Sequence, residues 1–171
     1  IEGIADLGMK VVEAFATNPN KQKGTSVQVS ISCSSFIPKP FTPFQWEPED
    51  SMESLRAKQK HLLESIPTKK IKVSYHETPT SLLEGVLARG DRRLSAVLYD
   101  AFKNGCKFDS WDEQFKFDVW MEAFRKNGID PYFYTQRRRD FSEVLPWDHL
   151  DYGITRKFLE RENIKAHENV I

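Results

Sequence analysis

The spacing of apolar residues predicts a helix followed by a strand, a second helix and a second strand in the N-terminal part of the chain. Apolar positions recur at helical spacing over residues 1–17, which predicts a helix that ends before Pro19. Over 25–34 the spacing falls to two, which is typical of a strand. A helix is then expected to about Ile66, and a short strand over 70–77. Strand, helix and strand at this spacing predict a βαβ unit with parallel strands.

Beyond Pro79 the pattern becomes helical. Capping residues, or a proline at the first helical position, signal helix starts at Ser81–Glu84, Asp91, Ser110–Glu113 and Asp130–Pro131. A last helix is predicted from about Thr155. The chain is therefore expected to divide near residue 78, into an α/β domain over 1–78 and a helical extension over 79–171.

A proline-rich segment, SSFIPKPFTPFQW, lies between the first strand and the second helix at residues 34–46. Its three prolines exclude a helix or a central strand, because proline lacks a backbone donor and fixes φ. The aromatic residues have two interpretations. They seal a core, or they pin a stiff loop across a neighbouring site.

Composition and charge weaken the case for several classes of protein, although a local charged patch is not excluded. The 171 residues carry 25 basic and 25 acidic side chains, so no overall field attracts nucleic acid or an anionic membrane. No apolar run has the length of a membrane helix. Cys33 and Cys106 fit no zinc, haem or disulfide spacing, which predicts no metal site in this chain and a reduced, cytoplasmic compartment.

Small hydroxyl residues occupy one face of the first predicted strand, at Ser30, Ser32 and Ser34. Such a face suits the hydrated lumen of a parallel barrel that holds a ligand. It also suits a strand that is exposed to water. The alternation alone does not decide between the two.

Three arginines surround a predicted corner between helices, at Arg89, Arg92 and Arg93. Guanidinium groups beside a helix N-terminus favour a phosphate or carboxylate ligand. The alternative is that Arg89 and Arg92 pair with local acids such as Asp91 or Glu84, and that the rest is a solvated face.

The segment 135–153 combines Arg137, Arg138 and Arg139 with aromatic and acidic residues. Basic residues among aromatics can bind single-stranded nucleic acid, so an RNA- or protein-binding module is the alternative function. The following acids cancel much of this charge and favour structural docking. His149 between Asp148 and Asp151 raises a further alternative, a hydrolase, although the sequence shows no nucleophile or metal ligand set beside it.

Four segments together resemble the C-terminal part of a family of large bacterial radical SAM proteins, often described as iron-sulfur oxidoreductases: VSISCSSFIPKPFTPFQW, LEGVLARGDRRLS, GCKFDSW and EVLPWDHLDYGITRKFLERE. They fall in the family's order over Val27–Glu162, nearly the whole chain. The resemblance implies the C-terminal end of a partial (β/α) TIM barrel followed by a helical subdomain. It also implies a parent enzyme that cleaves S-adenosylmethionine with a 4Fe-4S cluster, often with a cobalamin-binding-like domain ahead of the radical core.

The family's cluster-binding cysteines, a CxxxCxxC run, are expected upstream of Ile1, where the chain starts inside an amphipathic pattern without an initiator Met. On this resemblance the chain is a piece that is not catalytic alone, and its partner is the rest of its own parent chain. The resemblance implies that Ser30, Ser32 and Ser34 face adenosylmethionine. It places Lys39, Gln45 and Trp46, with Arg89, Arg92, Arg93 and His149, at a substrate or anion site.

Overall fold

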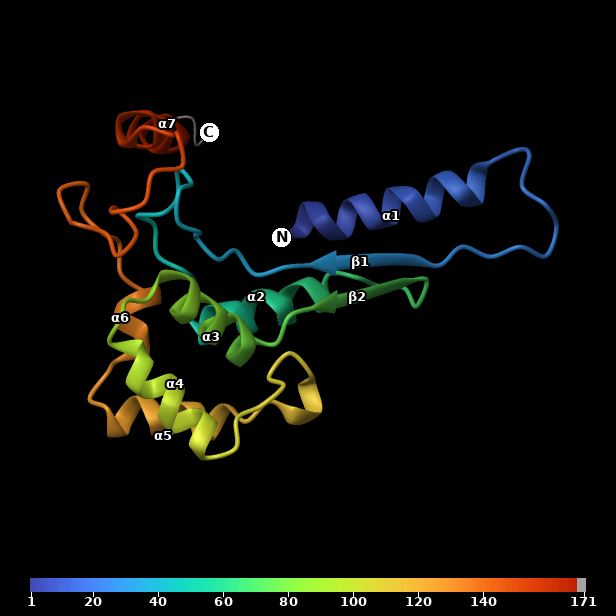
Figure 1. Ribbon diagram of the computed structural model, residues 1–171. Coiled ribbons are helices and arrows are strands. Elements are labelled where there is room, and N and C mark those ends of the chain that lie inside the picture. The colour runs from blue at the N-terminus through green and yellow to red at the C-terminus, as the bar shows by residue number, and fades with distance from the viewer. Residues whose placement is uncertain (169–171) are drawn as a thin grey trace. The chain divides into compact units, whose positions relative to one another are not determined.

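The computed structural model describes residues 1–168, and the chain forms two compact units (Figure 1). The first unit comprises Ile1–Ser35 and Ser51–Thr78, and the second comprises Phe36–Asp50 and Pro79–Ile171. Helices and one parallel sheet make up the regular structure, which confirms the mixed α/β class. The proline-rich segment lies in the second unit, although it follows the first strand in sequence.

The first unit contains a βαβ arrangement preceded by a helix. Its elements are α1 (Glu2–Thr17), β1 (Val29–Cys33), α2 (Met52–Glu64) and β2 (Ile71–Tyr75). The two strands lie side by side (Figure 1) and pair in parallel, from Val29 opposite Ile71 to Cys33 opposite Tyr75. Parallel pairing was predicted and is confirmed. Strand β1 is shorter than predicted, because its ladder with β2 covers only five residues.

Helix α1 packs against the sheet through a glycine. Gly8 is buried, and a Cβ atom there would lie 2.9 Å from Ile31 Cδ1 and 3.1 Å from Ile71 Cδ1. The absence of a side chain therefore lets α1 approach both strands closely. On the other face of β1, Ser30 and Ser32 are exposed.

The second unit is built from helices and connecting loops. These are α3 (Thr78–Arg89), α4 (Leu94–Lys103), the 3-10 turn η1 (Asp112–Gln114), α5 (Phe117–Lys126), α6 (Pro131–Thr135) and α7 (Arg156–Glu168). Trp46, Leu145, Trp147 and Leu159 form a core cluster that brings the proline-rich segment together with the C-terminal part of the chain. In the part of the chain that the structure describes, no helix combines the length and the apolar character needed to cross a membrane.

The predicted helix start with an N-cap residue followed by proline was correct, and the two starts predicted from capping boxes were wrong. Asp130 caps α6 by accepting a hydrogen bond from Tyr132 N at 2.9 Å, and Pro131 follows, as predicted. The capping box at Ser81 is wrong, since α3 already begins at Thr78, and Pro79 suits its first turn. The capping box at Ser110 is also wrong, because a 3-10 turn interrupts the chain before α5.

Candidate functional site

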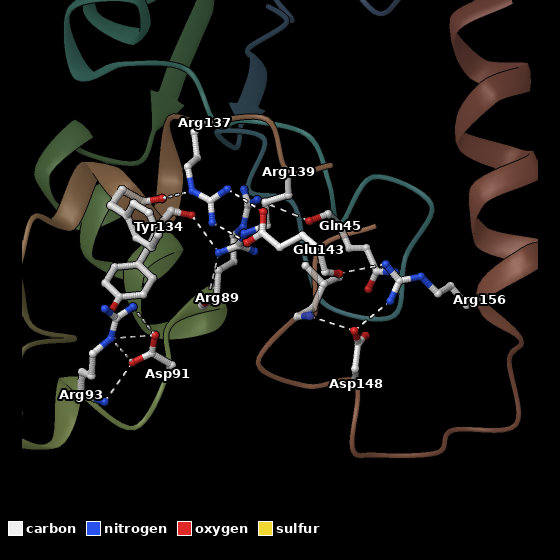
Figure 2. A network of polar contacts seen from close by, with 12 residues as sticks. Gln45, Arg89, Asp91, Arg93, Tyr134, Arg137, Arg139, Glu143, Asp148 and Arg156 are labelled. Carbon is white, nitrogen blue, oxygen red and sulfur yellow. Dashed lines mark hydrogen bonds and ion pairs between the residues drawn. The ribbon is translucent and has the colours of Figure 1, made fainter. Parts of the chain in front are cut away.

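A buried polar network in the second unit joins the proline-rich segment to residues far along the chain (Figure 2). Gln45 has 4% of its surface exposed, and its side-chain oxygen accepts hydrogen bonds from Phe41 N at 3.0 Å and Trp147 Nε1 at 2.8 Å. Trp46 is fully buried against Phe141, with the ring centroids 4.8 Å apart. The side-chain amide of Gln45 and the indole of Trp46 thus fix the proline-rich segment against the C-terminal part of the chain.

Arg89, the last residue of α3, has no exposed surface. Its Nη2 donates to Gln45 O at 3.4 Å, while Nε and Nη1 have no hydrogen-bond partner within residues 1–168. Burial lowers the pKa of Arg89 to about 10, and the charge of Arg139 acts in the same direction. The guanidinium therefore remains protonated at neutral pH, although it is fully buried.

Arg139 lies beside Arg89 (Figure 2) and is 3% exposed. Its Nη2 donates to Arg89 O at 3.1 Å and to Tyr134 O at 3.3 Å, and its guanidinium carbon lies 5.1 Å from the centroid of the Trp147 ring. Nε and Nη1 again have no partner. Carbonyl dipoles and an aromatic face thus provide its contacts, with no carboxylate among them.

Among the described residues, Glu49 is a buried carboxyl group whose negative charge would balance that of Arg89. It is 5% exposed, its backbone N donates to Thr135 O at 2.7 Å, and its Oε2 has no partner. Burial raises the pKa of Glu49 to about 7, although the positive charge of Arg89 opposes this shift. Near neutral pH the carboxyl is consequently only partly ionised.

The other two arginines of the Arg137–Arg139 run form ion pairs within the chain. Arg137 donates to both carboxylate oxygens of Glu143, at 2.7 and 2.5 Å. Arg138 lies 3.2 Å from Glu47. Because Arg137 and Arg138 have carboxylate partners and Arg139 is buried, these contacts do not favour the RNA-binding alternative.

The predicted site residues lie in several different places. Gln45, Trp46 and Arg89 come together in the buried network, and their side chains are not exposed at a loop surface. Lys39 is half exposed and pairs with Glu84 at 2.5 Å. Arg93 pairs with Asp91 at 2.6 Å, whereas the local-pair alternative named Arg89 and Arg92.

The remaining predicted residues make no described contact with this network. Arg92 and His149 are exposed, and in the first unit Ser30, Ser32 and Ser34 are exposed as well. Glu49 and Trp147 were not predicted to be site residues, and Arg139 was predicted only as one of three basic residues. The one local signal for Glu49 was an acidic residue directly after an aromatic proline-rich run, which is a weak signal.

The described residues provide no set of ligands for an iron-sulfur cluster. Within residues 1–168, no group of three or more His, Cys, Asp or Glu side chains is placed to hold a metal ion. Cys33 and Cys106 are free thiols and lie in different units. Burial raises the pKa of Cys106, which disfavours the thiolate that binds iron.

Comparisons of this chain with protein-family models, with curated proteins and with solved structures find no match. Function is therefore inferred from the sequence motifs and from the positions of their residues.

Proposed function

We propose that this chain is the C-terminal part of a radical SAM enzyme, in which it forms barrel wall and the rim of the substrate site. The observation that supports the proposal is the convergence of its sequence motifs. Gln45 of the first motif, Arg89 of the second and Trp147 of the fourth meet in one buried network, with Trp147 donating to Gln45 across 102 residues. Motifs that build one structural unit are expected to occur together and in a fixed order.

The parallel strands are compatible with a piece of a barrel. The order β1, α2, β2 is the repeating unit of a (β/α) barrel, whose active site lies at the carboxyl ends of its strands. Strand β1 ends at Cys33, and the proline-rich segment begins directly afterwards. In the parent enzyme, the exposed face with Ser30 and Ser32 would then turn toward the lumen and its adenosylmethionine.

The cluster chemistry is assigned to other parts of the parent enzyme. Two separate thiols do not fit a 4Fe-4S cluster, which takes four cysteine ligands or three plus an exchangeable one, so no catalytic step is derived for this chain. Its own residues would position the loop at the rim and shield a radical from water. A cytoplasmic location, where both thiols stay reduced, belongs to the same proposal.

The test is a form of the protein extended upstream of Ile1 and purified without oxygen. It should contain about four irons per chain and convert adenosylmethionine to 5′-deoxyadenosine on reduction. The 171-residue chain, treated identically, is the matched control and should do neither. An extended form with no CxxxCxxC run and no iron would overturn the proposal.

A further inference from the structure

The core of the second unit holds more positive than negative charge. Of its described side chains with at most 5% exposure, two are arginines, Arg89 and Arg139, and one is a carboxyl group, that of Glu49. Burial also holds Glu49 partly protonated near neutral pH. A buried guanidinium without a counter-charge is costly, because it has lost its hydration.

The nearby carboxylates are already occupied. Glu143 accepts two hydrogen bonds from Arg137. Glu47 accepts from Asn163 Nδ2 at 2.9 Å, and it also contacts Arg138 and His167. Neither carboxylate makes a described hydrogen bond to the buried pair, so the charges of Glu143 and Glu47 act on Arg139 and Arg89 only from a distance.

The buried pair also has unused donors. Four nitrogens, Nε and Nη1 of both Arg89 and Arg139, are enclosed and have no hydrogen-bond partner among the residues that the structure describes. Buried polar groups in folded proteins are normally paired with protein, water or a ligand. Two guanidinium groups with unpaired donors form a site that matches the acceptor oxygens of an anion.

A hollow of about 340 Å³ lies next to Arg139. Arg138, Arg139, Asp140 and Phe141 line it. The carboxylate of Asp140 is engaged by Ser142, whose backbone N and side-chain hydroxyl donate to it at 2.7 and 2.6 Å. Arg139 therefore connects the enclosed pair to a space large enough for a small ion.

We propose that the second unit binds a small oxyanion, a phosphoryl or carboxylate group, in the hollow beside Arg139 that Arg138 also lines. The bound anion supplies the charge that the buried pair lacks, and a change of the Arg139 rotamer brings its free donors to the ligand. This inference does not depend on the radical SAM proposal, since it uses only contacts within the second unit.

The experiment measures the thermal unfolding of the 171-residue chain in phosphate, acetate or chloride at matched ionic strength. Binding to the folded state alone should raise Tm saturably, by roughly 5 to 10 °C at a hundredfold excess over Kd. A rise with phosphate alone identifies a phosphoryl ligand, and a rise with acetate alone identifies a carboxylate. No saturable rise with either anion would overturn the inference, because the donors would then be hydrated by water.

Variants locate the site. Arg139→Gln should abolish the anion-dependent rise in Tm, and Arg138→Ala should weaken the Kd about three- to tenfold through loss of a charge-assisted contact. Arg125→Ala is the matched control, because Arg125 is exposed and pairs only with Glu122 among the described contacts. If Arg139→Gln does not fold, the Arg138→Ala variant decides. An unchanged Kd in that variant would overturn the proposed site.

Discussion

At the scale of single residues, the titration of Glu49 makes the second unit less stable as pH rises. Its pKa is raised from 4.5 to about 7, so the folded state binds a proton that the unfolded state releases between these values. The stability contributed by the protonated carboxyl is present below pH 4.5 and is lost as pH rises through 7.

We expect Glu49→Gln to remove this loss, because the amide does not ionise. The free energy of unfolding of the variant, relative to wild type, should therefore increase by about 3 kcal/mol between pH 4 and pH 8. Urea unfolding at several pH values measures this difference directly.

Glu47→Gln is the matched control for Glu49→Gln. Burial acts to raise the pKa of Glu47, but hydrogen bonds from Asn163 and His167 and the charge of Arg138 outweigh it, and the pKa is lowered. Glu47→Gln should consequently lose stability relative to wild type as pH rises, the opposite sign. Parallel pH profiles for the two variants would show that Glu49 is not the titrating group.

At the scale of elements, α3 depends on Gly85 to accommodate Glu49. A Cβ atom at Gly85 would lie 2.1 Å from Glu49 Oε2 and 3.0 Å from Thr135 Cγ2. Gly85→Ala should therefore destabilise the protein by about 1 to 3 kcal/mol, although alanine favours a helix by about 1 kcal/mol. Chemical denaturation measures the change.

Two companion variants make this prediction specific. Gly3→Ala in α1 meets no atom within 4 Å and should be neutral or stabilising by up to about 1 kcal/mol. In a Glu49→Ala background, Gly85→Ala should lose most of its cost, because the clashing carboxylate is gone. A cost that persists unchanged in the double variant would mean that Glu49 is not what Gly85 accommodates.

Elements were predictable wherever the signal is local. The alternation around Ile31 and Val73 fixes which face of each strand is apolar, and the Asp130-Pro131 pair carries its own capping chemistry. The capping box at Ser81 failed because a local motif does not reveal that the helix extends one turn further back.

The buried network was not predictable in this way. Arg89 and Arg139 look like surface arginines, and their burial follows from contacts with residues 44 and 50 positions away. Trp147 reaches Gln45 over an even longer separation. Periodicity shows which face of a helix or strand is apolar. It carries no information about which distant loop buries the guanidinium group of an arginine in the folded protein.

At the scale of the whole molecule, the second unit is discontinuous in sequence. It takes Phe36–Asp50 from within the predicted domain 1–78 and combines it with Pro79–Ile171. This segment supplies the fully buried Trp46 and the acceptor for Trp147. The stability of the second unit therefore depends on a segment that the sequence pattern placed in the α/β domain.

We expect a fragment of residues 79–171 to lack a cooperative unfolding transition. Losing a buried tryptophan alone costs about 3 to 5 kcal/mol, a large part of the 5 to about 15 kcal/mol that stabilises a typical domain. The fragment also leaves Trp147 Nε1 and the Arg89 guanidinium without their contacts to Gln45. Thermal unfolding followed by near-ultraviolet circular dichroism tests this expectation.

A peptide of residues 36–50, added to the fragment, should restore the transition by reforming the core around Trp46. The same peptide with Trp46→Ala is the control and should not, since it keeps the backbone but not the indole that packs on Phe141. A fragment that unfolds cooperatively without any peptide would show that the helical extension is an independent domain. Restoration by the wild-type peptide alone would instead show that the proline-rich segment belongs structurally to the C-terminal unit, whose charged core it completes.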